Sequence, residues 1–197
     1  MTRYLIGLTG NIATGKSAVG QILAELGALV IDADQVAHGL MKRGEPAWSA
    51  IVEAFGPAIL ASSGEINRRR LGEIVFADPA ALRRLDAIVH PSVCLAVNRI
   101  IAAASERVIV VEAIKLVEAG MHRDYHALWV TTCPPEMQIA RLIESRGLSE
   151  SEARLRVAAQ PPQAEKLALA DLIIDTGGTL EETRCQVIAA WKTGLEN

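Results

Sequence analysis

A glycine-rich segment close to the N-terminus constrains the fold more than any other part of this sequence. It matches the pattern G-x-x-x-x-G-K-[ST] and consists of Gly10, Asn11, Ile12, Ala13, Thr14, Gly15, Lys16 and Ser17. A strand-like run at 3–9 precedes it, and a helical pattern at 17–26 follows it. A loop in this setting directs backbone N–H groups and the positive end of a helix dipole at an anion. We therefore expect this segment to bind the phosphates of a nucleotide.

Two side chains of the segment suit ATP chemistry. The ammonium group of Lys16 can reach the β and γ phosphate oxygens, which makes Lys16 a candidate catalytic residue, and the hydroxyl of Ser17 can hold Mg²⁺. The pattern arises by chance in about one sequence in a hundred, or fewer, at this length. A glycine-rich turn without a ligand is the alternative. The strand before the segment and the helix after it favour ATP binding with Mg²⁺.

Short apolar runs alternate with helical patterns along the rest of the chain. Further strand-like runs lie at 28–31, 108–111, 128–131 and 172–174. Strand and helix in regular alternation predict an α/β fold with helices on both faces of a parallel sheet. We therefore expect a P-loop protein with a three-layer α/β/α core and a five-stranded parallel sheet.

Two stretches interrupt this alternation. Residues 36–105 are mostly helical in pattern and too long for one crossover, so we expect a helical insertion there. Residues 138–160 are polar and densely charged, and Ser149 with Glu152 is typical of a capping box that opens a helix. Such a hairpin is usually a solvated face, but in a nucleotide-binding protein it also suits a closing lid. The predicted core then consists of residues 1–35, 106–137 and 161–197.

Carboxylates follow two of the predicted strands. Asp32 and Asp34 come after the second strand, and Glu112 ends the apolar run 108–111. In open parallel sheets, ligands lie at the carboxyl ends of the strands. One aspartate can take a proton from an acceptor hydroxyl while the other positions Mg²⁺ through water, and Glu112 can hold Mg²⁺. The alternatives are helix capping by the aspartates and a Glu112 that faces solvent.

Basic and histidine side chains supply candidates for substrate contacts. The run Arg68-Arg69-Arg70 lies on a predicted helix, as either a solvated surface or a clamp on an anionic acceptor, and at most two of its members can face the same way. Arg141 lies in the charged hairpin and suits stabilisation of a transferring phosphoryl group. His38 and His90 are candidate substrate contacts, with packing or capping as the alternative.

A nucleotide-dependent switch is a competing class. Asp175-Thr176-Gly177-Gly178 fits the D-x-x-G pattern of GTPases, but it follows the last predicted strand and the sequence has no N-K-x-D guanine motif. We therefore favour a small-molecule kinase of the adenylate-kinase type.

Composition bounds the partners and the compartment. The formal net charge of −3 contrasts with the basic character of most proteins that bind nucleic acid. Cys94, Cys133 and Cys185 lack metal or redox spacing. No apolar run approaches the length of a membrane span. We expect a cytoplasmic protein, a monomer or a weak homo-oligomer, with neither nucleic acid nor membrane as a partner.

Several pieces of the sequence lie in an order and spacing that resemble a known family. They include Leu8-Thr9-Gly10, Thr14-Gly15-Lys16-Ser17, Ile31-Asp32-Ala33-Asp34, His90-Pro91, Gly147-Leu148-Ser149 and Ala170-Asp171. Together they resemble the dephospho-coenzyme A kinase family over nearly the whole chain. The resemblance implies a P-loop core, a helical domain that holds the coenzyme A precursor, and a mobile lid. It also implies ATP- and Mg²⁺-dependent phosphorylation of the ribose 3′-hydroxyl of dephospho-coenzyme A, the last step of coenzyme A synthesis.

The resemblance also assigns roles to residues. Asp34 corresponds to the family's candidate base, and Arg141 belongs to the nucleotide and lid side. Metal binding is expected of Ser17 and Glu112. Acceptor binding is expected of Asp32, His38, Arg68, His90 and Lys115. A nucleoside or nucleotide monophosphate kinase, which shares the core and the lid, remains the alternative.

The sequence departs from the family pattern at several positions. Lys115 lies in Glu112–Glu118, where Asp-x-Pro-Leu-Leu-Phe-Glu is usual, which puts a lysine near the acceptor. The other departures are Asn11 for a common glycine, Asn67 for an aspartate, Ser145 for a lid arginine and Thr176 for an asparagine. Because Lys16, Ser17 and Asp34 are all present, the expected activity is unchanged.

Overall fold

The structure of the protein, a computed structural model, describes residues 3–195. Residues 1–2 and 196–197 of the predicted core segments lie outside the described residues. The chain divides into two compact units. The first, here the sheet unit, runs up to Asp32 and continues from Ala104; the second, here the helical unit, is Ala33–Ala103. The predicted insertion spanned 36–105, and the difference at its start arises because a helix follows the second strand directly.

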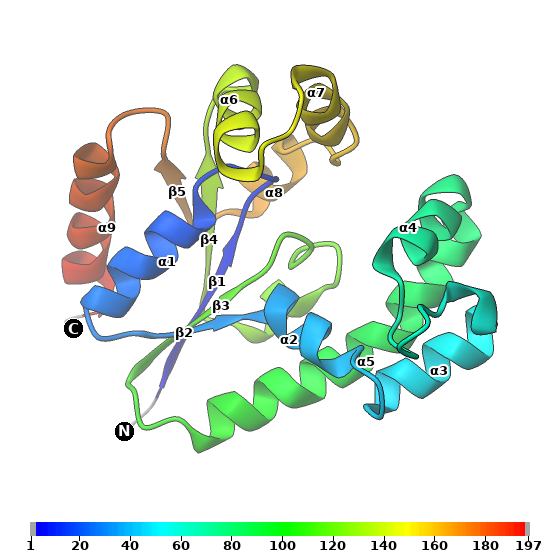
Figure 1. The fold of residues 1–197 in the computed structure, drawn as a ribbon. Coiled ribbons are helices and arrows are strands. Elements are labelled where there is room, and N and C mark those ends of the chain that lie inside the picture. Colours follow the sequence, from blue (N-terminus) through cyan, green and yellow to red (C-terminus); the bar gives the residue numbers. More distant parts are fainter. Residues whose placement is uncertain (1–2, 196–197) are drawn as a thin grey trace. The chain divides into compact units, whose positions relative to one another are not determined.

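Five strands form the sheet of the sheet unit (Figure 1). They are β1 (Tyr4–Thr9), β2 (Leu29–Asp32), β3 (Val108–Glu112), β4 (Ala127–Thr132) and β5 (Leu172–Asp175). Their order is β2-β3-β1-β4-β5, and every neighbouring pair is parallel. The five-stranded parallel sheet predicted from the sequence is confirmed. Because β1 lies in the centre of the sheet, the loop after it emerges between the carboxyl ends of β3 and β4.

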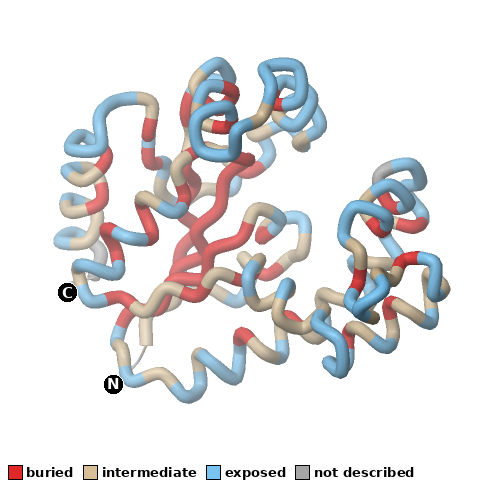
Figure 2. Tube along the Cα trace, in the orientation of Figure 1, coloured by how far each residue is buried: buried red, intermediate tan, exposed pale blue. Residues whose placement is uncertain are grey.

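Burial follows the place of each strand in the sheet. All five residues of β3 are buried, as expected for an apolar strand covered on both faces (Figure 2). The last four residues of β1 are buried too. The edge strand β5 instead alternates in exposure, and Ile174 is its one fully buried residue. The central strands therefore provide the rigid platform for the segments that follow them.

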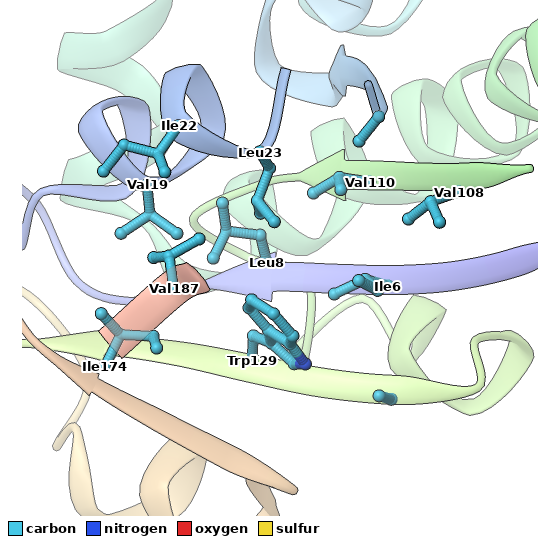
Figure 3. Packing of buried hydrophobic residues seen from close by; sticks show 12 residues of the cluster. Ile6, Leu8, Val19, Ile22, Leu23, Val108, Val110, Trp129, Ile174 and Val187 are labelled. Carbon is cyan, nitrogen blue, oxygen red and sulfur yellow. The ribbon is translucent and has the colours of Figure 1, made fainter. Parts of the chain in front are cut away.

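One face of the sheet packs against α1 (Lys16–Glu25) and α9 (Leu180–Leu195), which contact each other. Figure 3 shows Val19, Ile22 and Leu23 of α1 meeting side chains of the sheet. Trp129 of β4 and Val187 of α9 belong to the same buried cluster. The apolar residues of α1 thus recur at helical spacing on the face that packs against the sheet, and this packing fixes the helix that begins at the phosphate loop.

The other face of β1 is approached closely by the segment between β3 and β4, which contains η2 (Met121–Asp124). A Cβ atom on Gly7 would lie 2.8 Å from Cδ2 of Tyr125 and 3.0 Å from Cδ2 of Leu116. These distances are shorter than any ordinary carbon–carbon contact. Close packing rather than backbone conformation therefore favours a glycine in the middle of this central strand.

The predicted charged hairpin forms α6 (Pro135–Arg146) and α7 (Glu150–Ala158), and α8 (Ala164–Leu169) follows. Ser149 and Glu152 form the predicted capping box: the Ser149 hydroxyl accepts from the Glu152 amide, and Glu152 accepts from the Ser149 amide at 2.9 Å. Leu142 and Ala153 bury their side chains together with Ile12 of the phosphate loop. The hairpin is thus packed onto that loop.

The helical unit contains α2 (Ala33–Leu40), α3 (Pro46–Phe55), η1 (Pro57–Ile59), α4 (Arg68–Ala77) and α5 (Pro79–Ala103). Its core includes Ile51, Ile59, Leu71 and Val75. Asn67, where the resemblance leads us to expect an aspartate, caps α4 by accepting from the amides of Arg69 and Arg70. Because an amide oxygen performs this task as well as a carboxylate, the substitution preserves the start of the helix.

By length and composition, α5 is apolar enough to span a membrane, which differs from the expectation drawn from the sequence. The uninterrupted apolar runs are short because His90, Asn98 and Arg99 break them, whereas the average over a longer window is high. Leu82, Leu85 and Ile88 of α5 pack against the core of the helical unit. Only 11% of its apolar window is buried, so this packing covers a small part of the apolar surface of the helix.

Candidate active site

The segment Gly10–Ser17 forms a loop from the end of β1 to the start of α1. Gly10 has a φ of 151°, and a Cβ atom there would lie 2.6 Å from the carbonyl oxygen of Thr131 and against the Thr14 hydroxyl. Ala13 has a φ of 58°, the left-handed region that non-glycine residues seldom adopt. Gly15, with a φ of 85°, is the N-cap of α1. The loop thus wraps tightly before the helix begins, as phosphate binding requires.

Lys16 lies inside this loop. Its ammonium group donates to the carbonyl oxygens of Gly10 at 2.9 Å and Asn11 at 3.1 Å, and the residue is 7% exposed. The charge therefore lies among the loop's own carbonyl groups. This location suits contact with the terminal phosphates of a nucleotide.

Ser17 and Glu112 meet where α1 begins and β3 ends. The Ser17 hydroxyl donates to Oε1 of Glu112 at 3.3 Å. Gly20, one turn further along α1, permits this approach, because a Cβ atom there would lie 3.0 Å from Oε2 of Glu112. Glu112 is 8% exposed, and Asp32 is its register partner on β2. Ser17 thus lies at the end of the phosphate loop, while Glu112 and Asp32 end the neighbouring strands β3 and β2, and all three side chains carry oxygen atoms.

These oxygen donors are of the type that Mg²⁺ prefers. In nucleotide-dependent enzymes Mg²⁺ is commonly held by one or two protein oxygens together with phosphates and water. Among residues 3–195, no group of three or more His, Cys, Asp or Glu side chains is arranged to hold a metal. The chemistry of the Ser17 and Glu112 oxygens suits a metal that phosphates and water also ligate.

Hydrogen bonds from threonine side chains hold the phosphate loop against the ends of the strands. The Thr14 and Thr131 hydroxyls lie 2.8 Å apart, and Thr14 also donates to the carbonyl oxygen of Asn11 at 2.8 Å. Thr176, after β5, donates to the carbonyl oxygen of Thr14 at 2.8 Å. On the other side, Thr9 donates to the carbonyl oxygen of Ala113 at 2.7 Å and so anchors the segment after β3. These buried bonds join the loop to the ends of three strands.

Arg141 of α6 ties the loop to the segment after β5. Its guanidinium donates to the carbonyl oxygen of Ala13 at 3.2 Å and to the carbonyl oxygen of Thr176 at 2.6 Å. Cys133 lies beside it, with 3.5 Å between Sγ and Nη1 of Arg141. Burial raises the pKa of the Cys133 thiol, while the positive charge of Arg141 acts in the opposite direction. The bond to Ala13 stabilises the left-handed residue of the loop.

Asn11 has partners that the sequence did not reveal. Its side chain donates to the carbonyl oxygen of Pro161 at 2.9 Å and accepts from Lys166 at 3.0 Å. Its backbone amide donates to Oε1 of Gln163 at 3.3 Å. Gln163 in turn donates to the carbonyl oxygen of Thr131 at 2.8 Å. The residue that replaces a common glycine is therefore a main attachment point of the loop.

The remaining predicted residues of the helical unit lie on three of its helices. Asp34 is in the first turn of α2 and His38 in its last turn, while His90 is on α5, which packs against α2. The imidazole of His90 contacts Cys94, with 3.6 Å between Nε2 and Sγ. Arg68 begins α4.

Two neighbours of Arg68 have structural partners. Arg69 pairs with Glu73 at 3.2 Å, and Arg70 donates to the carbonyl oxygen of Leu60 at 2.9 Å. Lys115 belongs to the sheet unit and is an exposed residue of the segment after β3. The predicted residues are thus divided between the two units.

Comparison with known proteins identifies the family. The dephospho-CoA kinase family model, CoaE, matches residues 4–182. A dephospho-CoA kinase of Symbiobacterium thermophilum is 45% identical over 95% of this chain and 80% of its own length. The crystal structure of TT1252 from Thermus thermophilus has a TM-score of 0.87 at 29% identity and covers 99% of both chains. A dephospho-CoA kinase from Campylobacter jejuni has a TM-score of 0.67 at 27% identity and covers 95% of both chains. The matches extend over nearly the whole chain, and this protein belongs to the dephospho-CoA kinase family.

Proposed function

We propose that this protein transfers the terminal phosphoryl group of ATP to the ribose 3′-hydroxyl of dephospho-coenzyme A, giving coenzyme A and ADP. The observation that carries the proposal is the loop Gly10–Ser17, in which Lys16 lies inside the loop and Ser17 meets Glu112. Membership of the dephospho-CoA kinase family supports dephospho-coenzyme A as the acceptor of the phosphoryl group. The alternative, a nucleoside or nucleotide monophosphate kinase, is not favoured by these matches.

The loop and α1 bind the phosphates of ATP in this proposal. Backbone amides of the loop and the amino end of α1 face the phosphates, and Lys16 contacts the β and γ oxygens. Arg141 holds the loop in shape through Ala13, and in this proposal its guanidinium also acts on the phosphoryl group as it transfers. Together these cationic and N–H groups stabilise the negative charge of the transition state.

Ser17 and Glu112 would hold Mg²⁺. The metal, when bound, offsets the charge of the β and γ phosphates. The Ser17 hydroxyl and the buried Glu112 carboxylate are the protein oxygens available for it at the end of β3. Asp32, in register with Glu112, is proposed to assist from β2 through acceptor or water contacts.

Asp34 is proposed as the general base. It follows β2 by two residues, and a carboxylate accepts the proton of a sugar hydroxyl as the oxygen attacks the γ phosphorus. His38, Arg68, His90 and Lys115 are proposed to bind the acceptor. Arg68 is preferred over its neighbours because Arg69 and Arg70 already have partners within α4 and next to η1. An arginine suits the phosphates of dephospho-coenzyme A.

A direct test supplies the purified protein with ATP, Mg²⁺ and one acceptor at a time. We expect ADP and coenzyme A from dephospho-coenzyme A, with the new phosphate at the ribose 3′ position. Turnover of nucleosides or nucleotide monophosphates in place of dephospho-coenzyme A would overturn the proposal. ADP formation without an acceptor serves as the background control.

The setting of the enzyme is proposed along with its activity. We propose a cytoplasmic enzyme that acts as a monomer or a weak homo-oligomer, with ATP and dephospho-coenzyme A as its partners and neither nucleic acid nor membrane among them. The net charge of −3 supports the part that concerns nucleic acid.

A further inference from the structure

Lys166 of α8 is a buried cation next to the phosphate loop. Its side chain is 2% exposed, and its ammonium group pairs with Oε1 of Glu118 at 2.8 Å. The same group donates to Oδ1 of Asn11 at 3.0 Å. A buried ammonium requires partners of this kind, because loss of its hydration is costly. Lys166 therefore has little freedom to move unless both partners move with it.

Both polar atoms of the Asn11 side chain form hydrogen bonds. Oδ1 accepts from Lys166, while Nδ2 donates to the carbonyl oxygen of Pro161 at 2.9 Å. The backbone amide donates to Gln163 at 3.3 Å, and the carbonyl oxygen accepts from Lys16. Asn11 is 7% exposed. The second residue of the phosphate loop is thus clamped to the segment between α7 and α8.

Glu118 extends this connection to the segment after β3. Its side chain is 31% exposed, so the pair with Lys166 lies at the boundary of the protein interior. The same segment contains Lys115 and follows Glu112. Buried ion pairs contribute little net stability on average, because desolvation offsets their attraction. We therefore attribute the Lys166–Glu118 pair to the fixed geometry that it imposes rather than to a gain in the stability of the fold.

We propose that Lys166 is a positioning residue for phosphoryl transfer: through Asn11 it fixes the start of the phosphate loop, and through Glu118 it joins the loop to the segment after β3. The inference rests on the proposed nucleotide-dependent activity and deepens it. Asn11 provides the contact that a glycine at this position would lack, so the coupling depends on this particular departure from the family pattern.

A double-mutant cycle tests the proposal by nucleotide binding alone. The dissociation constant of a non-hydrolysable ATP analogue with Mg²⁺ is measured for Lys166→Met, Asn11→Gly and the double variant. We expect Lys166→Met to weaken binding about tenfold in the wild-type background, within the range of coupling between contacting residues. In the Asn11→Gly background the same change should weaken binding by less than about twofold. Lys192→Met, an exposed lysine on α9, is the matched control.

Melting temperatures separate this role from general support of the fold. A merely structural lysine would lower the melting temperature and weaken nucleotide binding equally with or without Asn11, and that result would overturn the proposal. Unchanged binding in Lys166→Met would also overturn it. If Lys166→Met does not fold, Glu118→Gln takes its place in the cycle, and its effect on binding must again depend on Asn11.

The readouts also separate this inference from the proposed activity. Binding of the ATP analogue does not involve the acceptor, so the cycle keeps its meaning if dephospho-coenzyme A is not turned over. If it is turned over, Lys166→Met should raise the KM for ATP and leave the KM for dephospho-coenzyme A unchanged. A rise in the acceptor KM alone would contradict the proposed role of Lys166 in positioning the phosphate loop.

Discussion

The Ser17 hydroxyl donates a hydrogen bond to Oε1 of Glu112 over 3.3 Å, and this contact joins the first turn of α1 to the end of β3. The two residues are far apart in the sequence. Their meeting follows from the sheet order, which places β3 beside β1. Residues 10–17 include no aspartate or glutamate, and this contact places the carboxylate of Glu112 beside the loop.

Glu112→Gln should impair the use of Mg²⁺ more than the binding of nucleotide. The amide keeps the size of the side chain and can still accept from Ser17, but it removes the negative charge that a cation requires. We expect the Mg²⁺ concentration for half-maximal rate to rise about tenfold or more. Titration of Mg²⁺ at saturating ATP measures this. A normal Mg²⁺ dependence would exclude Glu112 from the metal site.

Asp34→Asn should separate binding from chemistry. An amide cannot accept the proton of the attacking hydroxyl, so we expect kcat to fall by about two orders of magnitude or more. Nucleotide affinity should stay close to that of the wild type, as calorimetry would show. Asp78→Asn is the matched control, because Asp78 caps α5 through its Oδ1 and an asparagine can do the same. A near-normal kcat in Asp34→Asn would remove the role of base from Asp34.

Arg68→Met and Arg69→Met form a matched pair on one helix. Loss of a charge-assisted contact to an acceptor phosphate should raise the KM for dephospho-coenzyme A about tenfold in Arg68→Met. Arg69→Met loses only an exposed pair with Glu73 and should leave that KM unchanged. Steady-state kinetics at saturating ATP measure both. Equal effects of the two substitutions would indicate a general surface charge rather than a specific contact.

The capping box of α7 should make part of the stability pH-dependent. Hydrogen bonds from the Ser149 hydroxyl and amide lower the pKa of Glu152. A carboxylate with a lowered pKa in the folded state stabilises the fold above its unfolded pKa of about 4.3, and this contribution is lost as the pH falls through the folded pKa. The difference in melting temperature between the wild type and Ser149→Ala should therefore be larger at pH 7 than at pH 3.

Differential scanning fluorimetry across this pH range measures the difference. Loss of the Ser149 hydroxyl as acceptor for the Glu152 amide remains at every pH, so a smaller difference should persist in acid. A difference that stays constant from pH 7 to pH 3 would contradict the assigned pKa direction.

Features encoded by neighbouring residues were predictable from the sequence. The five strands, the helix after the phosphate loop and the capping box at Ser149 all follow from local patterns, and the structure contains them. The family also followed from short motifs in order, and the comparisons confirm it. The roles assigned to Asp34, Arg68 and His90 stay predictions, since their chemistry concerns molecules other than the protein.

Contacts between distant residues were not predictable. Asn11 and Lys166 are separated by 155 positions, and a lysine in a short helix gives no sign that it will be buried. The sequence likewise did not distinguish Arg70, which donates to the carbonyl oxygen of Leu60, from Arg68. The average apolar character of α5 was missed for another reason, because polar residues interrupt its apolar runs without interrupting the helix.

The close packing around Gly7 limits which residues can replace it during evolution. A Cβ atom at this position would lie 2.8 Å from Cδ2 of Tyr125 and 3.0 Å from Cδ2 of Leu116, on a strand that pairs with a neighbour on each side. A side chain gained there forces Tyr125 or Leu116 to shift, and a smaller residue at one of those positions removes that strain. Positions 7, 116 and 125 should therefore evolve as a correlated set, and an alignment of relatives should show any alanine or serine at position 7 accompanied by a smaller residue at one of the others.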